Sequence, residues 1–106
     1  MAESWQRVAA LSELSEGDAF PVKLGDRLIA LYQLDGKVYA IDDVCTHEFA
    51  QLSQGFVEGG EIECPLHQAR FDIRTGRCVA PPATEDLQSY PVRIEGDDVY
   101  VNVPAE

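Results

Sequence analysis

Short runs of β-forming residues recur along the chain, and turns that contain glycine separate them. The turns are Gly25-Asp26, Asp35-Gly36, Gly59-Gly60, Thr75-Gly76 and Glu95-Gly96-Asp97, and the runs around them are 21–24, 27–34, 37–41, 56–58, 61–64, 69–73, 90–94 and 98–103. An Asp-Gly pair between two such runs is a strong short-range signal for a β-hairpin. Many short strands with turns every 8–12 residues predict an all-β fold, a small antiparallel sandwich or barrel.

The last two runs also alternate with the period of a strand. Tyr90, Val92 and Ile94 are expected to share one face, as are Val99, Val101 and Val103. A helical turn is expected only over 10–16, with Ser12 as its cap.

Length and charge limit the class of protein. The 106 residues fit one domain, 1–106, with a modest core. Eight basic and 19 acidic side chains give a net charge of −11, which disfavours nucleic acid and membrane surfaces as partners. A protein with a basic patch is the expected partner.

The thiols and the N-terminal residues favour the cytoplasm. Three cysteines form an odd, sparse set, unlike the disulfide framework of a secreted domain. The first seven residues carry no signal-peptide pattern. We expect a cytoplasmic protein with reduced thiols.

Two short segments carry the metal-binding chemistry. Cys45-Thr46-His47 and Cys64-Pro65-Leu66-His67 each combine a thiol with an imidazole, and 16 residues separate them. These soft ligands suit iron–sulfur centres, zinc or copper. A diiron centre with two cysteines on one iron and two histidines on the other has this ligand count. A structural zinc site and a Cys/His nucleophile remain alternatives.

The spacing resembles the Rieske 2Fe-2S motif. The stretch CTHEFAQLSQGFVEGGEIECPLHQARFDIRTG resembles the Rieske-type ferredoxins of bacterial aromatic-ring-hydroxylating dioxygenase systems, and the likeness extends over essentially the whole chain. It implies an antiparallel β sandwich with a cluster-binding subdomain, about 43–83, formed by two loops. It also implies one Rieske-type 2Fe-2S cluster, with Cys45 and Cys64 on the inner iron and His47 and His67 on the outer iron.

The resemblance implies a carrier and not an enzyme. A monomeric ferredoxin of this kind passes single electrons from an NAD(P)H-dependent flavoprotein reductase to a terminal Rieske non-haem iron oxygenase, which acts in aromatic hydrocarbon catabolism. The chain itself lacks a Gly-rich dinucleotide fingerprint, so a separate reductase has to supply the electrons. The alternatives are the small subunit of a nitrite reductase-like system and a zinc-stabilised interaction module.

Departures from related patterns predict a low reduction potential. High-potential Rieske proteins carry a disulfide at the positions of Ala50 and Leu66, and hydroxyl donors to the cluster at those of Ala69 and Phe71. Without these donors the potential is expected near the bottom of the Rieske range of roughly −150 to +300 mV. Gln68 replaces a frequent glycine, so the backbone there is expected to differ.

Three further features have expected roles. Asp42, Asp43 and Glu48 flank the first motif and are expected to form an acidic rim that steers a basic partner. Pro81-Pro82 resembles the proline loop that covers the cluster in this family. Cys78 is expected to be a half-buried thiol on a strand.

Overall fold

The computed structural model describes residues 4–45, 50–65, 68–81 and 85–103. In this part of the chain, strands form three antiparallel sheets. The middle sheet has the order β2-β3-β4-β9, with β2 Ala19–Leu24, β3 Arg27–Leu34, β4 Lys37–Asp42 and β9 Ser89–Tyr90. The first outer sheet is β1-β11-β10, with β1 Trp5–Ala10, β11 Asp98–Asn102 and β10 Val92–Glu95. The second outer sheet is β5-β6-β7-β8, with β5 Phe56–Glu58, β6 Glu61–Glu63, β7 Arg70–Asp72 and β8 Cys78–Ala80.

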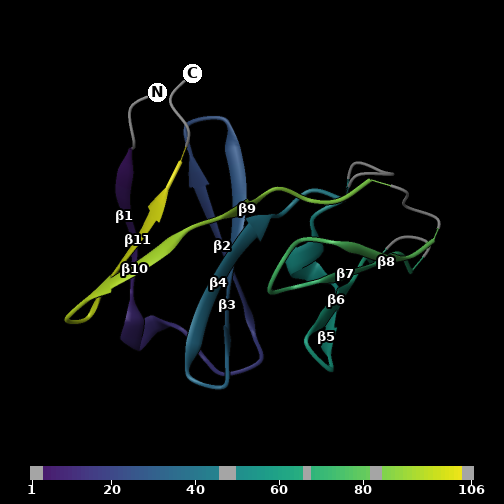
Figure 1. Ribbon diagram of the computed structural model, residues 1–106, viewed down its shortest axis with the longest axis horizontal. Helices are drawn as coiled ribbons and strands as arrows, with labels where there is room; N and C mark the ends of the chain where they lie inside the picture. The colour runs from purple at the N-terminus through teal and green to yellow at the C-terminus, as the bar shows by residue number, and fades with distance from the viewer. Residues whose placement is uncertain (1–3, 46–49, 66–67, 82–84, 104–106) are drawn as a thin grey trace.

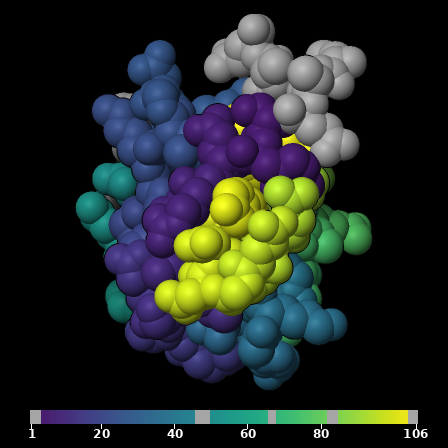
Figure 2. Space-filling view, turned by 90° about the vertical axis from the view of Figure 1, so that its left-hand side faces the viewer, coloured from purple at the N-terminus to yellow at the C-terminus, as the bar shows by residue number. Residues whose placement is uncertain are grey.

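The three sheets lie in layers, with the middle sheet between the two outer ones (Figure 1). The side view shows β1, β11 and β10 next to one another over one face of the molecule (Figure 2). Two 3-10 turns complete the described elements, η1 Leu11–Glu13 and η2 Leu52–Gln54. Within the described residues, no helix has the length and apolar character needed to cross a membrane. The fold is therefore the expected antiparallel β sandwich, here with a third layer.

Strand β3 is buried on both faces because it lies at the centre of these layers. Ile29 and Leu31 belong to the core against the first outer sheet, whereas Ala30 and Tyr32 belong to the core against the second. All four side chains are fully buried. A strand covered on both sides has no polar face, which explains the unbroken apolar run in this part of the sequence. Burying each large apolar side chain contributes about 1.5–3 kcal/mol.

The expected hairpins are confirmed, but the run 90–94 is divided between two sheets. Tyr90 pairs with Ala40 in the middle sheet, and Pro91 then leads the chain into β10. The prediction that Tyr90, Val92 and Ile94 share one face is wrong, since Tyr90 belongs to the middle sheet, whereas Ile94 is 41% exposed at the edge of the first outer sheet.

The expected helical turn is shorter than 10–16, and its cap is different. Only Leu11–Glu13 is helical, and the Glu13 carboxylate accepts a hydrogen bond from the Ala10 N–H at 2.8 Å. Ser12 instead donates its N–H and its hydroxyl to Asp97, each at 3.0 Å.

Hydrogen bonds among Asp42, Gln88, Tyr90 and Arg27 form a clasp where the chain leaves the middle sheet after β4 and returns to it at β9. Asp42 ends β4, and its N–H donates to the Gln88 carbonyl at 3.0 Å. The Tyr90 hydroxyl donates to Asp42 Oδ1 at 2.5 Å and accepts from Arg27 at 3.1 Å. The segment between Asp42 and Gln88, which contains the second outer sheet, is thus fastened at its base.

The clasp predicts a loss of stability at alkaline pH. Burial, together with the hydrogen bond to Asp42, raises the pKa of Tyr90 from 10.0 to about 12. The folded state therefore keeps the phenol protonated between pH 10 and 12, where the unfolded state releases the proton. Tyr90 contributes stability below pH 10 that is lost as the pH rises through about 12.

We expect the free energy of unfolding to fall more steeply over this pH window in the unmodified protein than in Tyr90→Phe. Urea unfolding at a series of pH values measures this difference. Equal slopes for the two proteins would contradict the assignment.

Candidate metal centre

Two loops at one end of the second outer sheet are closed in the same way. The Cys45 N–H donates to the Ala50 carbonyl at 3.0 Å, and the Cys64 N–H donates to the Ala69 carbonyl at 2.7 Å. In both loops the acceptor lies five residues after the cysteine. Each histidine of the motifs falls between these paired residues in the sequence. The structure therefore gives the two Cys/His segments equivalent loop closures.

The second loop connects β6 to β7. Cys64 directly follows β6, and Ala69 directly precedes β7, so the loop continues a hairpin of paired strands. Gln68 has a φ of 64°, in the left-handed region that favours glycine. Gln68 thus adopts a backbone conformation of the glycine type.

The first loop follows β4 and is held by Asp43. This carboxylate accepts hydrogen bonds from the Ser53 N–H and hydroxyl, both at 2.7 Å, and from the Gln51 side chain at 3.2 Å. Asp43 is 1% exposed. The expectation that Asp43 belongs to an exposed acidic rim is therefore wrong.

The other two residues of the expected acidic rim are Asp42 and Glu48. Asp42 is half-buried and takes part in the clasp with Tyr90. Glu48 lies outside the described residues.

Both cysteines lie in the core between the middle sheet and the second outer sheet. Cys45 is 4% exposed and Cys64 is fully buried. His47 and His67 lie outside the described residues, as do Leu66 and Pro82. Two buried thiols in one core, each on a hydrogen-bonded loop, suit the inner iron of a diiron cluster, because thiolates are the soft ligands that iron–sulfur centres take. The described residues fit the expected cluster.

Cys78 has a different position. It lies in β8 opposite Phe71 and is half-buried, as expected for a thiol on a strand. Its sulfur is 3.7 Å from the Ala80 carbonyl oxygen, and its N–H donates to Asp86 at 2.8 Å. Cys78 lies in neither ligand loop, although it packs against the core that contains Cys45 and Cys64.

One buried polar group near the loops, the Tyr32 hydroxyl, was not predicted from the sequence. The Tyr32 hydroxyl is buried and makes no hydrogen bond within the described part of the chain. Burial, followed by the negative charge of Asp43, raises its pKa. Tyr32 and Asp43 are 11 positions apart in sequence, and the antiparallel pairing of β3 with β4, which Asp43 directly follows, brings them near each other.

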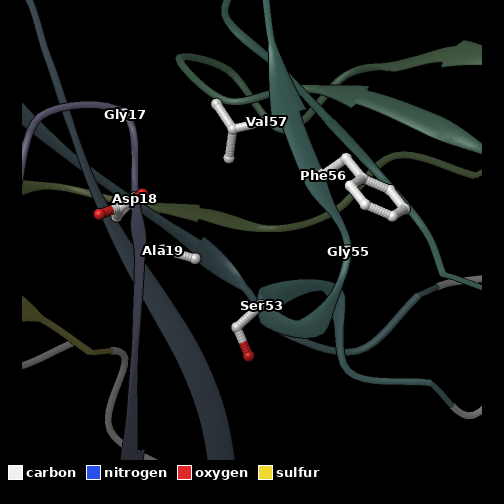
Figure 3. A pocket seen from close by; sticks show the side chains of 7 residues that line it. All are labelled: Gly17, Asp18, Ala19, Ser53, Gly55, Phe56 and Val57. Atoms are coloured by element: carbon white, nitrogen blue, oxygen red, sulfur yellow. The ribbon is translucent and has the colours of Figure 1, made fainter.

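An open pocket of about 440 Å³ lies beside the first loop, between the start of β2 and the segment from η2 to β5 (Figure 3). Gly17, Asp18 and Ala19 line one side, and Ser53, Gly55, Phe56 and Val57 line the other (Figure 3). Asp18 is the single charged residue among these seven. The Ser53 hydroxyl is already bonded to Asp43. The lining therefore provides no pair of groups suited to acid–base catalysis.

The layered β fold and the two cysteine loops define an iron–sulfur protein of the Rieske type. Residues 4–91 match the Rieske 2Fe-2S domain. The chain belongs to the Rieske 2Fe-2S family, and it carries one 2Fe-2S cluster of the Rieske type.

Several relatives with similar sequences and structures are ferredoxins. The chain is 48% identical over 103 residues to the ferredoxin component of a naphthalene 1,2-dioxygenase system from Pseudomonas aeruginosa, covering 97% of this chain and 99% of that protein. Among solved structures, the Sphingomonas yanoikuyae B1 ferredoxin matches with a TM-score of 0.90 and 34% identity, over 95% of this chain and 100% of the other. A ferredoxin in complex with the reduced oxygenase of carbazole 1,9a-dioxygenase matches with a TM-score of 0.87 and 35% identity, over 92% of each chain. The chain is an electron-transfer component and not a catalytic subunit.

Proposed function

We propose that the protein carries single electrons from an NAD(P)H-dependent flavoprotein reductase to a terminal Rieske oxygenase that hydroxylates an aromatic compound. The observation that supports this most strongly is the pair of equivalent cysteine loops, in a chain whose relatives are ferredoxin components of dioxygenase systems. The named relatives favour this role over a nitrite reductase-like system. We expect the carrier to be monomeric and cytoplasmic, where NAD(P)H reaches the reductase.

The ligands of this proposal are Cys45 and Cys64 on the inner iron and His47 and His67 on the outer iron. When bound, the cluster supplies reversible one-electron chemistry. The two cysteine side chains lie in the core, which keeps water away from the thiolates. We assign the cluster-binding subdomain to about 43–83, within the segment that the Asp42–Gln88 clasp fastens to the middle sheet.

The acidic charge supports a partner with a basic docking surface. The chain has a net charge of −11, and each reduction adds one negative charge. Attraction between opposite charges raises association rates and weakens as salt shortens the Debye length.

Anaerobic mixing tests the proposed route. NADH should reduce the protein only when a flavoprotein reductase is present. The reduced protein should then transfer one electron per chain to the oxidised oxygenase of the Pseudomonas aeruginosa naphthalene system, with that system's own ferredoxin as the positive control. No transfer from this chain, while the control ferredoxin transfers, would contradict the oxygenase assignment.

The low reduction potential is a separate prediction. Ala69 and Phe71 are both fully buried beside the second loop, and neither carries a hydroxyl group. Ala69→Ser and Phe71→Tyr should each raise the potential by tens of millivolts where the new hydroxyl donates to a cluster sulfur, since one such bond stabilises the reduced state by about 1 kcal/mol. Protein-film voltammetry measures the shift, with Val79→Ser on the exposed part of β8 as a control. A clearly positive potential for the unmodified protein would refute the low-potential assignment.

A further inference from the structure

Both the side chain and the backbone of Asp43 are hydrogen-bonded to neighbouring segments of the chain. Its carboxylate accepts the Ser53 N–H on Oδ1, and accepts the Ser53 hydroxyl and the Gln51 amide on Oδ2. Its backbone N–H donates to the Leu28 carbonyl at 2.9 Å, and its carbonyl accepts from the Leu52 N–H at 2.7 Å. A single buried residue therefore joins β3 to both arms of the first loop.

These bonds close the base of the loop that carries Cys45. Val44 and Gln51 form an isolated antiparallel bridge, and Cys45 and Ala50 form the next bond toward the tip. Asp43 bonds to Gln51 in this short ladder and to Ser53, which lies just beyond it on the side away from the tip. Without the carboxylate, the Gln51–Ser53 arm would lose its main side-chain anchor.

The buried charge of Asp43 has a second consequence. Both of its oxygens act as acceptors, as in an ionised carboxylate, and its side-chain donors are neutral groups. Within the described residues, no ion pair involves Asp43. Asp43 precedes Cys45 by two residues, so the Cα atoms of the two residues are at most about 7 Å apart. A fixed negative charge so close to the centre, away from water, opposes the addition of an electron.

We propose that Asp43 is a positioning residue of the cluster site, whose carboxylate holds the first ligand loop closed and whose negative charge lowers the reduction potential. The inference rests on the proposed assignment of Cys45 as a ligand. Asp43 also helps to raise the pKa of Tyr32, because its negative charge disfavours a second negative charge on the phenol in the same way as it disfavours an added electron on the cluster.

The chain offers a matched control for this role. Asp97 binds Ser12 in the same way as Asp43 binds Ser53, with one oxygen on the N–H and the other on the hydroxyl. Asp97 is exposed and lies in the turn between β10 and β11, in the first outer sheet and on the other side of the middle sheet from β5–β8 (Figure 1). Asp97→Asn therefore removes an equal charge and replaces one of two equivalent acceptor oxygens with an amide nitrogen, far from the ligand loops.

The test compares Asp43→Asn with Asp97→Asn in the cluster-containing protein. Asp43→Asn should shift the reduction potential in the positive direction and should bleach roughly tenfold faster in the presence of an iron chelator, since the amide accepts fewer and weaker hydrogen bonds from the Gln51–Ser53 arm than the carboxylate does. Asp97→Asn should leave both the potential and the bleaching rate unchanged. An unaltered potential in Asp43→Asn would refute the charge effect, and an unaltered bleaching rate would refute the loop-closing role.

A second variant keeps the proposal testable if Asp43→Asn does not fold. Ser53→Ala keeps the charge of Asp43 and removes one of its donors, so it should accelerate bleaching without a positive shift in potential. A positive shift in potential, or an unchanged bleaching rate, would overturn the proposal. Absence of a cluster in the unmodified protein would instead refute the proposed function itself.

Discussion

Replacing His47 or His67 with alanine is expected to abolish the Rieske centre. Each imidazole is one of two assigned ligands of the outer iron, and alanine supplies no donor atom in its place. The purified variants should lose their visible absorption and the EPR signal of the reduced state. Iron analysis should show loss of metal from each chain.

Cys78→Ala is the control for these variants, because the Cys78 thiol lies on β8, outside both ligand loops. It should keep its cluster and its potential. Full colour and an unchanged EPR spectrum in either histidine variant would show that the ligand assignment is wrong.

Gly55→Ala is expected to have a large effect on folding. A Cβ atom at position 55 would overlap the Glu63 carbonyl oxygen, a backbone atom that no change of side-chain rotamer can move away. Glu63 precedes Cys64, so the displaced backbone would include the second ligand loop. We expect a loss of at least ~2 kcal/mol in stability, or about 8 °C or more in Tm, measured by thermal unfolding.

Gly96→Ala separates this steric effect from the general effect of losing a glycine. Gly96 has a φ of 62°, and a Cβ atom added there would meet no other atom within 4 Å. Its substitution therefore costs only the left-handed backbone strain of about 1 kcal/mol. Equal destabilisation by the two variants would contradict the role given to the Gly55–Glu63 contact.

The hairpins could be predicted from the sequence because their turns and strands are local. Gly25-Asp26 and Asp35-Gly36 both lie between paired strands, as expected. Strand β1 could not be found in this way, since it pairs with β11 at the other end of the chain, with Trp5 opposite Asn102. The prediction of one shared face for the run 90–94 failed because the apolar alternation continues across Pro91, where the chain passes from the middle sheet to the first outer sheet.

The ligand segments could be predicted because the chemistry of a metal site depends on residue types at short spacings. The position of Cys45 and Cys64 in one core agrees with that prediction. The burial of Asp43 could not be predicted, since an aspartate is rarely buried unless it has hydrogen-bond partners, and the sequence does not show which residues these are. Those partners, Leu28 and the Gln51–Ser53 arm, come together only in the folded chain.

The presence of a redox-active Rieske cluster is open to a decisive measurement. This is an anaerobic redox titration of the purified protein, followed by visible absorption and EPR and combined with iron and sulfide analysis. We expect a coloured protein with two irons and two acid-labile sulfides per chain. It should take up one electron per chain at a low potential and then show the EPR signal of a reduced Rieske centre. A colourless protein that holds zinc and takes up no electron would contradict the assignment of an electron carrier.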